Sequence, residues 1–363
     1  MTDRLILTVA MTLFVPAVLM AQENGLPTTK EQASQVVEPI AVTAARLQAP
    51  GTAAQPPAPR RAERRRRGSM VGYLEDATVT TQVRMRFDAG FGNDVPDRAE
   101  FFYAKCGCYQ FDPPPYFDPD APGPGPGVPT ELRFQQWYLQ ADYAWRERLA
   151  LFAELPVRAI QPQGFLALGS PYNPFPNHAG LGDIRVGAKA ALISDDTHDL
   201  TVQFRASMPT GDADEGLGTD NWSVEPGLLF HHSLSDRMGL EGQFSFWHPF
   251  GGSAGVVSPD SFSGNVLTYG IGPAFDLVTT ERIRFTPVLE LVAWRVIGGF
   301  ETNCETDLTC TFEADDNIVH LKFGARTTMA DRHSFYVGYG RALTDEAWYS
   351  DVLRLEYRFN FGM

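Results

Sequence analysis

Charged side chains of this 363-residue chain recur at positions that share one face of an extended strand. Six cations show this spacing, in three separate segments: Arg84 and Arg86, Lys322 and Arg326, and Arg354 and Arg358. Two acids, Glu225 and Glu241, take equivalent positions in two other segments. Cations fixed opposite carboxylates create a field that orients dipolar or anionic solutes. The chemistry that we expect is therefore binding and steering of solutes.

These side chains meet only if the segments that carry them belong to one sheet. From residue 77 onward the sequence alternates apolar and polar residues with period 2, which is typical of β-strands. Twelve segments show it: 77–90, 132–146, 148–160, 181–193, 199–209, 221–233, 238–248, 264–277, 282–296, 316–327, 334–342 and 352–361. Short connections alternate with long ones along the chain, as in outer-membrane barrels. The pattern predicts an all-β fold, a transmembrane antiparallel up-and-down barrel of about 12 strands over 77–363.

Closure of such a barrel pairs its first and last strands. The six cations would then form a basic lumen wall, and Glu225 and Glu241 an acidic wall on the opposite side. An alternative is that these charges pair with each other and plug a narrow pore, as side chains fill small barrels.

The composition excludes several classes of protein. The net charge of −14 argues against a nucleic-acid partner, because phosphate contacts need clustered cations. After residue 21 no run of 18 apolar residues occurs, which excludes a multi-helix membrane protein. A content of 33 Gly, 27 Pro and 25 Phe favours turn-rich β structure over long helices.

The N-terminal part of the chain has a different composition. Residues 1–21 carry Arg4 before an apolar stretch, which predicts a secretory signal peptide. Residues 22–76 show no periodicity and predict a disordered periplasmic tail with an Arg-rich run at 60–67. Within it, residues 38–44 (EPIAVTA) resemble a TonB box, a segment that binds a TonB-like periplasmic partner by strand addition. Two interpretations of the Arg run stay open, namely contact with anionic phospholipid on the periplasmic side and a plain solvated linker.

Two short motifs lie in the alternating part of the chain, Gly-Leu-Gly-Asp at 180–183 and Pro-Thr-Gly-Asp at 209–212. Both resemble motifs of the outer-membrane barrel family associated with the meta-pathway of phenol degradation. The residues that carry the resemblance are Gly180, Gly182, Asp183, Pro209, Thr210, Gly211 and Asp212. Similarity extends over residues 130–363 and implies transport without naming a substrate.

Four cysteines fall in predicted outer loops, where an oxidising environment favours disulfides. The candidates are Cys106, Cys108, Cys304 and Cys310, and their connectivity stays open between pairing within and across the two loops. We predict no metal site, no cofactor and no enzymatic activity. Barrel hydrolases place Ser and His together on the lipid face, and only Ser334 beside His333 approaches this pattern.

These patterns together predict a porin-like channel or transporter in the outer membrane of a Gram-negative bacterium. Its solutes would be small molecules, with aromatic or other hydrophobic compounds among the candidates, and passage through the charged lumen would be passive. A non-transporting structural or surface barrel is the alternative, and an outer-membrane hydrolase is the third. The expected partners are outer-membrane lipid and lipopolysaccharide, the solute, and no nucleic acid.

Overall fold

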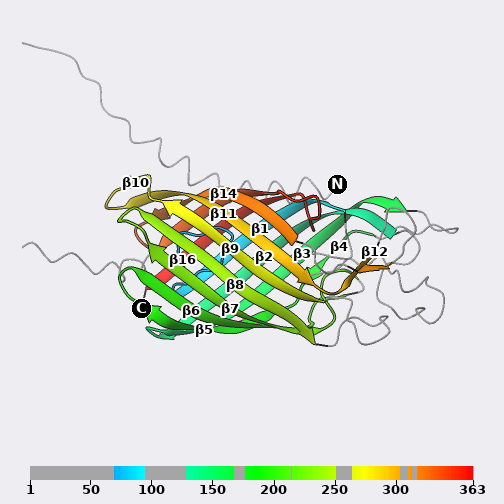
Figure 1. Cartoon of the computed structure of the whole chain (residues 1–363), viewed down its shortest axis with the longest axis horizontal. Coiled ribbons are helices and arrows are strands. Elements are labelled where there is room, and N and C mark those ends of the chain that lie inside the picture. Colours follow the sequence, from blue (N-terminus) through cyan, green and yellow to red (C-terminus); the bar gives the residue numbers. More distant parts are fainter. Residues whose placement is uncertain are drawn as a thin grey trace, which may run out of the picture. The chain divides into compact units, whose positions relative to one another are not determined.

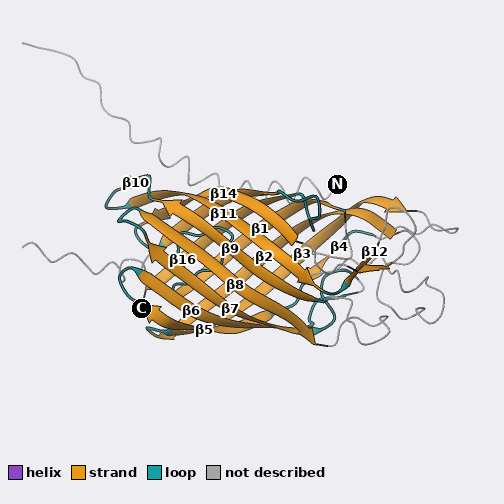
Figure 2. Ribbon diagram, in the orientation of Figure 1, coloured by secondary structure: helices purple, strands orange, loops and turns teal. Residues whose placement is uncertain are grey.

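The computed structural model describes residues 69–94, 128–166, 176–213, 215–250, 264–302, 310–312 and 317–362. All of these residues belong to one unit of the chain, Pro57–Met363. Every regular element in the described part is a β-strand (Figure 2). The described residues include no helix that is long and apolar enough to cross a membrane.

Twelve long strands form the wall of a barrel. They are β1 (Thr81–Asn93), β2 (Val128–Arg146), β3 (Leu149–Leu166), β5 (Arg185–Ser194), β6 (His198–Ser207), β7 (Trp222–Ser233), β8 (Met238–Phe250), β9 (Asn265–Phe275), β11 (Ile283–Ile297), β14 (Asn317–Met329), β15 (His333–Ala342) and β16 (Asp351–Gly362). The short strands β4 (His178–Leu181) and β10 (Val278–Thr279) extend the same sheet. A separate ribbon pairs β12 (Phe300–Thr302) with β13 (Cys310–Phe312).

The sheet closes because its ends pair with each other. Each long strand is antiparallel to the next along the chain, including β9 and β11. The first and last strands, β1 and β16, lie side by side from Gln82 opposite Asn360 to Phe91 opposite Asp351 (Figure 1). Closure gives each of the twelve long strands a neighbour on both sides, which matters in lipid because no water is present to satisfy a free edge. The closed twelve-stranded barrel predicted from the alternation is confirmed.

Alternation separates an apolar exterior from a largely polar interior. On β1 the side chains of Gln82 and Arg84 are buried, whereas Met85 between Arg84 and Arg86 is 50% exposed. The same outward exposure recurs around the ring at Leu139, Leu151, Val157, Phe204, Leu228, Phe244, Leu289, Phe323, Val337 and Leu353. A continuous apolar exterior around buried charges fits a barrel whose outer face contacts lipid.

Four of the prolines inside strands also lie within the strands predicted from the sequence, and we expect bulges or strand ends at these four positions. Each of them pairs in register on one side and falls at a gap in the ladder on the other. Pro226 is opposite Phe204 of β6, but the pairing of β7 with β8 is interrupted at this point. Pro156, Pro273 and Pro287 show the same one-sided pairing. The reason is that proline has no N–H to donate to a second neighbour.

One predicted strand is divided in two. We expect a single strand over 181–193, but residues 182–184 leave the ladder between β4 and β5. Gly182 N still donates to Pro156 O at 2.9 Å, and Asp183 turns into the barrel with 2% exposure. The Gly-Leu-Gly-Asp motif therefore marks a break in the wall and not the beginning of a strand.

The first strand begins later than expected because the chain enters the barrel before it. Residues 69–80, here called the luminal segment, lie inside the barrel and continue into β1 at Thr81. The composition assigned 69–76 to the tail and 77–80 to the first strand, and both assignments are wrong for these residues. Val71, Leu74 and Asp76 are each 2% exposed or less. The predicted signal peptide 1–21, the rest of the predicted tail, 22–68, and the TonB-like segment 38–44 within it lie outside the described residues.

Candidate functional site: the lumen and its N-terminal segment

The structure places all eight predicted wall residues on the inner face of the barrel. Exposure is below 10% for every one of them, and they are Arg84, Arg86, Lys322, Arg326, Arg354, Arg358, Glu225 and Glu241. The cations lie on β1, β14 and β16, which are adjacent or separated only by β15. The two acids lie on β7 and β8, across the ring.

The interior holds further charges that the wall assignment did not include. Four more buried cations lie on β3, β5 and β6, namely Arg158, Arg185, Lys189 and Arg205. Glu290 on β11 is also buried, and it extends the acidic arc beyond Glu241. All of them occupy inward positions of the same alternation. Assigning every second residue of each strand to the lumen would therefore have identified them from the sequence. The basic arc thus runs from β14 round to β6, while the inward positions of the described strands β7, β8 and β9 carry no Lys or Arg.

The inward cations are engaged in ion pairs. Arg354 binds Asp88 through two bonds of 2.7 Å. Glu356 accepts from Arg326 at 2.7 Å, lies within 3.4 Å of Arg84 and also pairs with Arg358. Such pairs compensate much of the field that two bare walls would produce. The geometry therefore contains both the two-wall arrangement and the charge pairing that we gave as its alternative.

The luminal segment donates its backbone N–H groups to the acidic arc. Glu290 accepts from Gly72 N at 3.0 Å, Tyr73 N at 2.8 Å and Leu74 N at 3.3 Å. Further along the arc, Met70 N donates to Glu241 at 3.1 Å, and Glu75 N donates to Gln243 at 2.7 Å.

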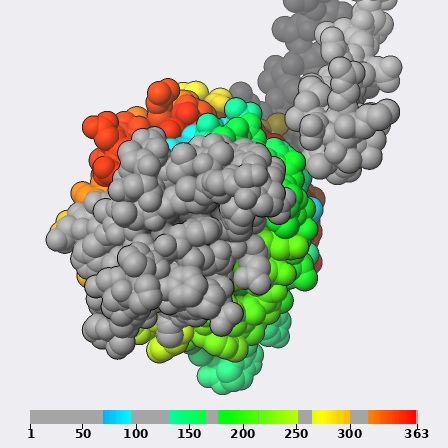
Figure 3. All heavy atoms as spheres, turned by 90° about the vertical axis from the view of Figure 1, so that its right-hand side faces the viewer, coloured from blue at the N-terminus to red at the C-terminus, as the bar shows by residue number. Residues whose placement is uncertain are grey.

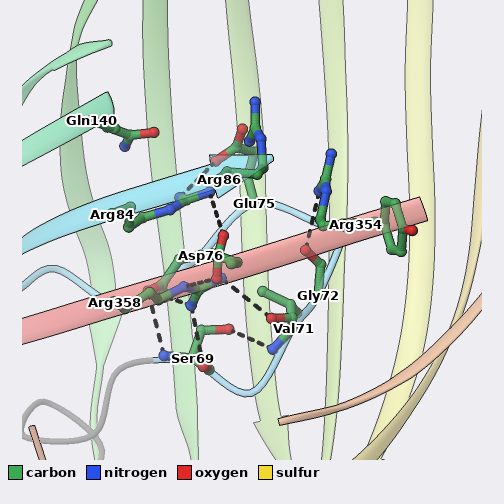
Figure 4. A network of polar contacts seen from close by, with 12 residues as sticks. Ser69, Val71, Gly72, Glu75, Asp76, Arg84, Arg86, Gln140, Arg354 and Arg358 are labelled. Carbon is green, nitrogen blue, oxygen red and sulfur yellow. Dashed lines mark hydrogen bonds and ion pairs between the residues drawn. The ribbon is translucent and has the colours of Figure 1, made fainter. Parts of the chain in front are cut away.

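The carbonyl groups of the same segment face the basic arc (Figure 4). Arg358 donates to Ser69 O at 3.2 Å and to Val71 O at 3.3 Å. Arg354 donates to Gly72 O at 3.1 Å, and Lys189 donates to Asp76 O at 2.8 Å. Carbonyl oxygens carry negative partial charge and N–H groups positive, so the two arcs orient the segment as they would a dipolar solute.

Glu75 adds a charged side chain to this arrangement. It pairs with Arg205 at 2.6 Å and with Arg84 at 3.5 Å. Burial alone would raise the pKa of Glu75, but Arg205 and Arg84 outweigh burial and hold that pKa well below its ordinary value. Glu75 therefore stays ionised and joins cations of β1 and β6 within the basic arc.

The long-loop half of the interior, here called the apolar half, holds a large apolar cluster beside a few buried polar side chains such as Asp183 and His320. The cluster includes Leu132, Phe134, Ile160, Trp247, Val266, Trp294, Val296, Ile318, Trp348 and Tyr349. Ring centroids of Trp294 and Trp348 are 5.6 Å apart, and those of Phe134 and Tyr349 also 5.6 Å. Figure 3 views the barrel from this end, with the described strands at the margin.

A cavity of about 60 Å³ lies where the apolar half meets the charged half. Phe134, Trp294 and Tyr349 line it from one side, and Tyr73 of the luminal segment from the other. Cations on its wall lie over aromatic faces: Lys322 Nζ is 4.4 Å from the Tyr73 ring centroid and 4.8 Å from that of Trp294. This volume holds a few water molecules, so a larger solute requires movement of the lining.

The family motifs are brought together at the break between β4 and β5. Asp183 accepts from Gly211 N at 3.0 Å, Thr219 N at 2.9 Å and Thr219 Oγ1 at 2.8 Å. Thr210 Oγ1 donates to Gly182 O at 2.9 Å, which ties the second motif to the first. These bonds fold the loop after β6 inward, and Leu217 of this loop is 2% exposed. Gly180, Pro209 and Asp212 flank the contacts.

Other predicted sites are only partly covered by the structure. Cys106, Cys108 and Cys304 lie outside the described residues, and Cys310 begins β13, so disulfide pairing stays a prediction. Ser334 is buried inside and accepts from Arg326 Nη1 at 3.0 Å, so it does not share a lipid face with its neighbour His333. No group of three or more His, Cys, Asp or Glu that suits a metal ion occurs among the residues described.

The fold and the lumen define a transmembrane β-barrel with a charged, occupied interior. A family model described as "Putative MetA-pathway of phenol degradation" matches residues 118–252, a span that contains both motifs. The resemblance inferred from those motifs is confirmed, although the matched span ends well before residue 363. Comparison with curated proteins finds no match.

Several solved structures are similar to the chain at low identity. The COG4313 outer membrane channel from Pseudomonas putida F1 is 13% identical with a TM-score of 0.49, over 81% of this chain and 100% of its own. The β domain of the Bordetella autotransporter BrkA is 13% identical with a TM-score of 0.45, over 78% and 100%. LpxR from Salmonella typhimurium is 9% identical with a TM-score of 0.40, over 77% and 100%.

Proposed function

We propose that the protein is an outer-membrane channel of a Gram-negative bacterium that passes small aromatic or other hydrophobic compounds passively. The observation that carries this proposal is the division of the interior. An apolar, aromatic half faces the long loops, a charged half faces the short turns, and the cavity beside Trp294 joins them. An aromatic solute would leave water for the first half by the hydrophobic effect.

The charged half would then pass the solute onward. Cations that lie over ring faces, such as Arg86 at 3.7 Å from the Tyr138 ring centroid and Arg354 at 4.2 Å from that of Tyr73, can exchange one aromatic partner for another. Polar groups of the lumen would replace hydration of the polar substituents. The apolar exterior supports placement in a bilayer, with outer-membrane lipid and lipopolysaccharide as the surrounding partners.

Uptake by cells tests the proposal. A strain that lacks the protein is complemented with wild type, with Trp294→Ala or with Trp222→Ala, and uptake of a panel of labelled aromatic and aliphatic solutes is measured. Trp294 is 2% exposed inside the barrel and Trp222 is 54% exposed on the outer face. The two variants therefore remove the same type of side chain from the inner and the outer face of the barrel wall. We expect Trp294→Ala to change aromatic uptake about threefold or more, since stacking contributes roughly 1 kcal/mol.

Trp222→Ala should leave uptake unchanged. Equal uptake of every solute with and without the protein would contradict the proposal and favour the second candidate, a non-transporting structural barrel. That candidate is favoured by one observation, namely that ion pairs and the luminal segment occupy much of the lumen. Conductance in planar bilayers separates the two candidates, because only a channel carries current.

A further inference from the structure

Glu290 is a buried carboxylate whose hydrogen bonds, within the described part of the chain, all come from the luminal segment. It lies on β11 with 1% exposure and receives the N–H groups of Gly72, Tyr73 and Leu74. Successive N–H groups that converge on one anion form a concave binding geometry. A buried carboxylate is unfavourable without such donors. The position of Glu290 is therefore explained by its contact with this segment.

The same stretch of backbone is also held from β16, which is separated from β11 by β14 and β15. Arg354 donates to Gly72 O at 3.1 Å, and its guanidinium lies 4.2 Å from the Tyr73 ring centroid. Arg354 is itself fixed by its two bonds to Asp88. Glu290 and Arg354 thus hold Gly72 and Tyr73 between two strands that lie on different arcs of the ring.

The wall does not depend on the segment for its own pairing. The barrel closes through β1 with β16 and β9 with β11, and residues 69–76 belong to none of these ladders. The segment contacts the wall through side chains such as Glu241, Glu290 and Arg358. Its departure would break no ladder hydrogen bond among the described strands of the barrel, and its C-terminal end leads into β1 at Thr81.

We propose that residues 69–76 are a releasable gate, bound inside the lumen at a peptide-binding site formed by Glu290 on one side and Arg354 on the other. Release opens the path from the apolar half to the short-turn end and exposes Glu290 opposite the basic arc. The effect of release on transport rests on the proposed channel function, whereas binding and release of the segment do not.

Site-specific proteolysis of the folded full-length protein in detergent tests release directly. Chymotrypsin cleaves after Tyr73 and Leu74, which are buried in the bound segment, and mass spectrometry identifies these cuts. Glu290→Gln keeps the shape of the side chain but removes the charge that the three N–H groups bind. We expect cleavage at these positions to accelerate about tenfold, because cleavage follows the population of the released form.

Glu154→Gln is the matched control. Glu154 is 3% exposed on β3 and pairs with Arg185 at 2.8 Å and Arg86 at 3.6 Å, and neither of these ion pairs involves residues 69–76. Cleavage in this variant should stay within about twofold of wild type. Equal acceleration in both variants, or none in Glu290→Gln, would overturn the proposal.

A second variant displaces the segment by a steric collision with the barrel wall. A Cβ at Gly72 would lie 2.0 Å from Tyr336 Cζ, so Gly72→Val should expel the segment and accelerate the same cuts. Adding Tyr336→Ala removes the collision and should restore protection. Protection of Gly72→Val as complete as in wild type would overturn the proposal. If cleavage responds as expected while no variant conducts in planar bilayers, the gate stands and the channel function fails.

Discussion

At the scale of single residues, the lumen is organised by shared partners. Glu356 serves three arginines, Arg84, Arg326 and Arg358, so none of these cations acts as an isolated charge on solute. A buried charge without a counter-charge is costly, which explains why inward cations and acids interleave on β1 and β16. Selectivity then depends on the excess of positive charge in the basic arc and less on any single side chain.

Removing part of that excess should change ion selectivity. In Arg84→Gln, Arg354→Gln and Arg358→Gln combined, the carboxylates Asp88 and Glu356 lose cationic partners. We expect the reversal potential under a KCl gradient to shift toward cation preference, with about a threefold rise in the K⁺ to Cl⁻ permeability ratio. Arg295→Gln, on the exposed face of β11, is the control and should not shift it. An unchanged reversal potential in the triple variant would favour a lumen in which these charges only pair.

At the scale of elements, the break between β4 and β5 shapes the long-loop end. The wall gives up three residues of pairing there, and Asp183 uses this freedom to bind Gly211 and Thr219 of the loop after β6. A Cβ on Gly218 would lie 2.6 Å from Asp183 Oδ1, so the loop approaches closely only because this residue is glycine. Arg158 completes the contact by donating to Leu217 O at 2.5 Å.

Loss of the Asp183 carboxylate should destabilise this end of the barrel. Asp183→Ala leaves three buried or part-buried donors without their acceptor, and we expect the free energy of unfolding to fall by about 3 kcal/mol. Guanidinium unfolding in micelles, followed by tryptophan fluorescence, measures the change. Asp212→Ala, at an exposed position of the second motif, should cost only about 0.5 kcal/mol. Similar losses in the two variants would show that the Asp183 contacts do not stabilise the fold.

At the scale of the whole molecule, the barrel and the chain before it are separable. The ring of described strands begins at Thr81 and closes on itself through β1 and β16. The TonB-like segment at 38–44 precedes the luminal segment along the chain. A periplasmic partner that binds 38–44 would therefore pull on a chain that leads to the gate, and we offer this as a proposal.

Deletion of residues 22–68 tests both statements. The shortened protein should still fractionate with the outer membrane and show heat-modifiable mobility, because the ring is complete without the deleted residues. Uptake that is lost while bilayer conductance persists would support the partner at 38–44, and unchanged uptake would remove that proposal. Recovery of either form as a soluble periplasmic monomer would contradict the location in the outer membrane.

The direction of each side chain was open to prediction from sequence because it is a local property. In a strand, parity alone assigns Arg84 to one face and Met85 to the other, whatever the strand pairs with. Strand number, the inward position of the eight wall residues and the apolar exterior all follow from this periodicity. The irregular pairing at the prolines was predictable for the same reason, since the missing N–H of Pro226 limits pairing on its own strand.

Only the tertiary structure decided what occupies the lumen. Residues 69–76 carry no strand periodicity, and many of their hydrogen bonds go to residues more than 160 positions away, such as Glu241 and Glu290. Burial of the segment without these acids, or of the acids without the segment, would be unfavourable, because each supplies hydrogen-bond partners to the other. Such mutual dependence has no local signature in a sequence. It exists only once the ring closes and brings β8, β11 and β16 around the same stretch of backbone.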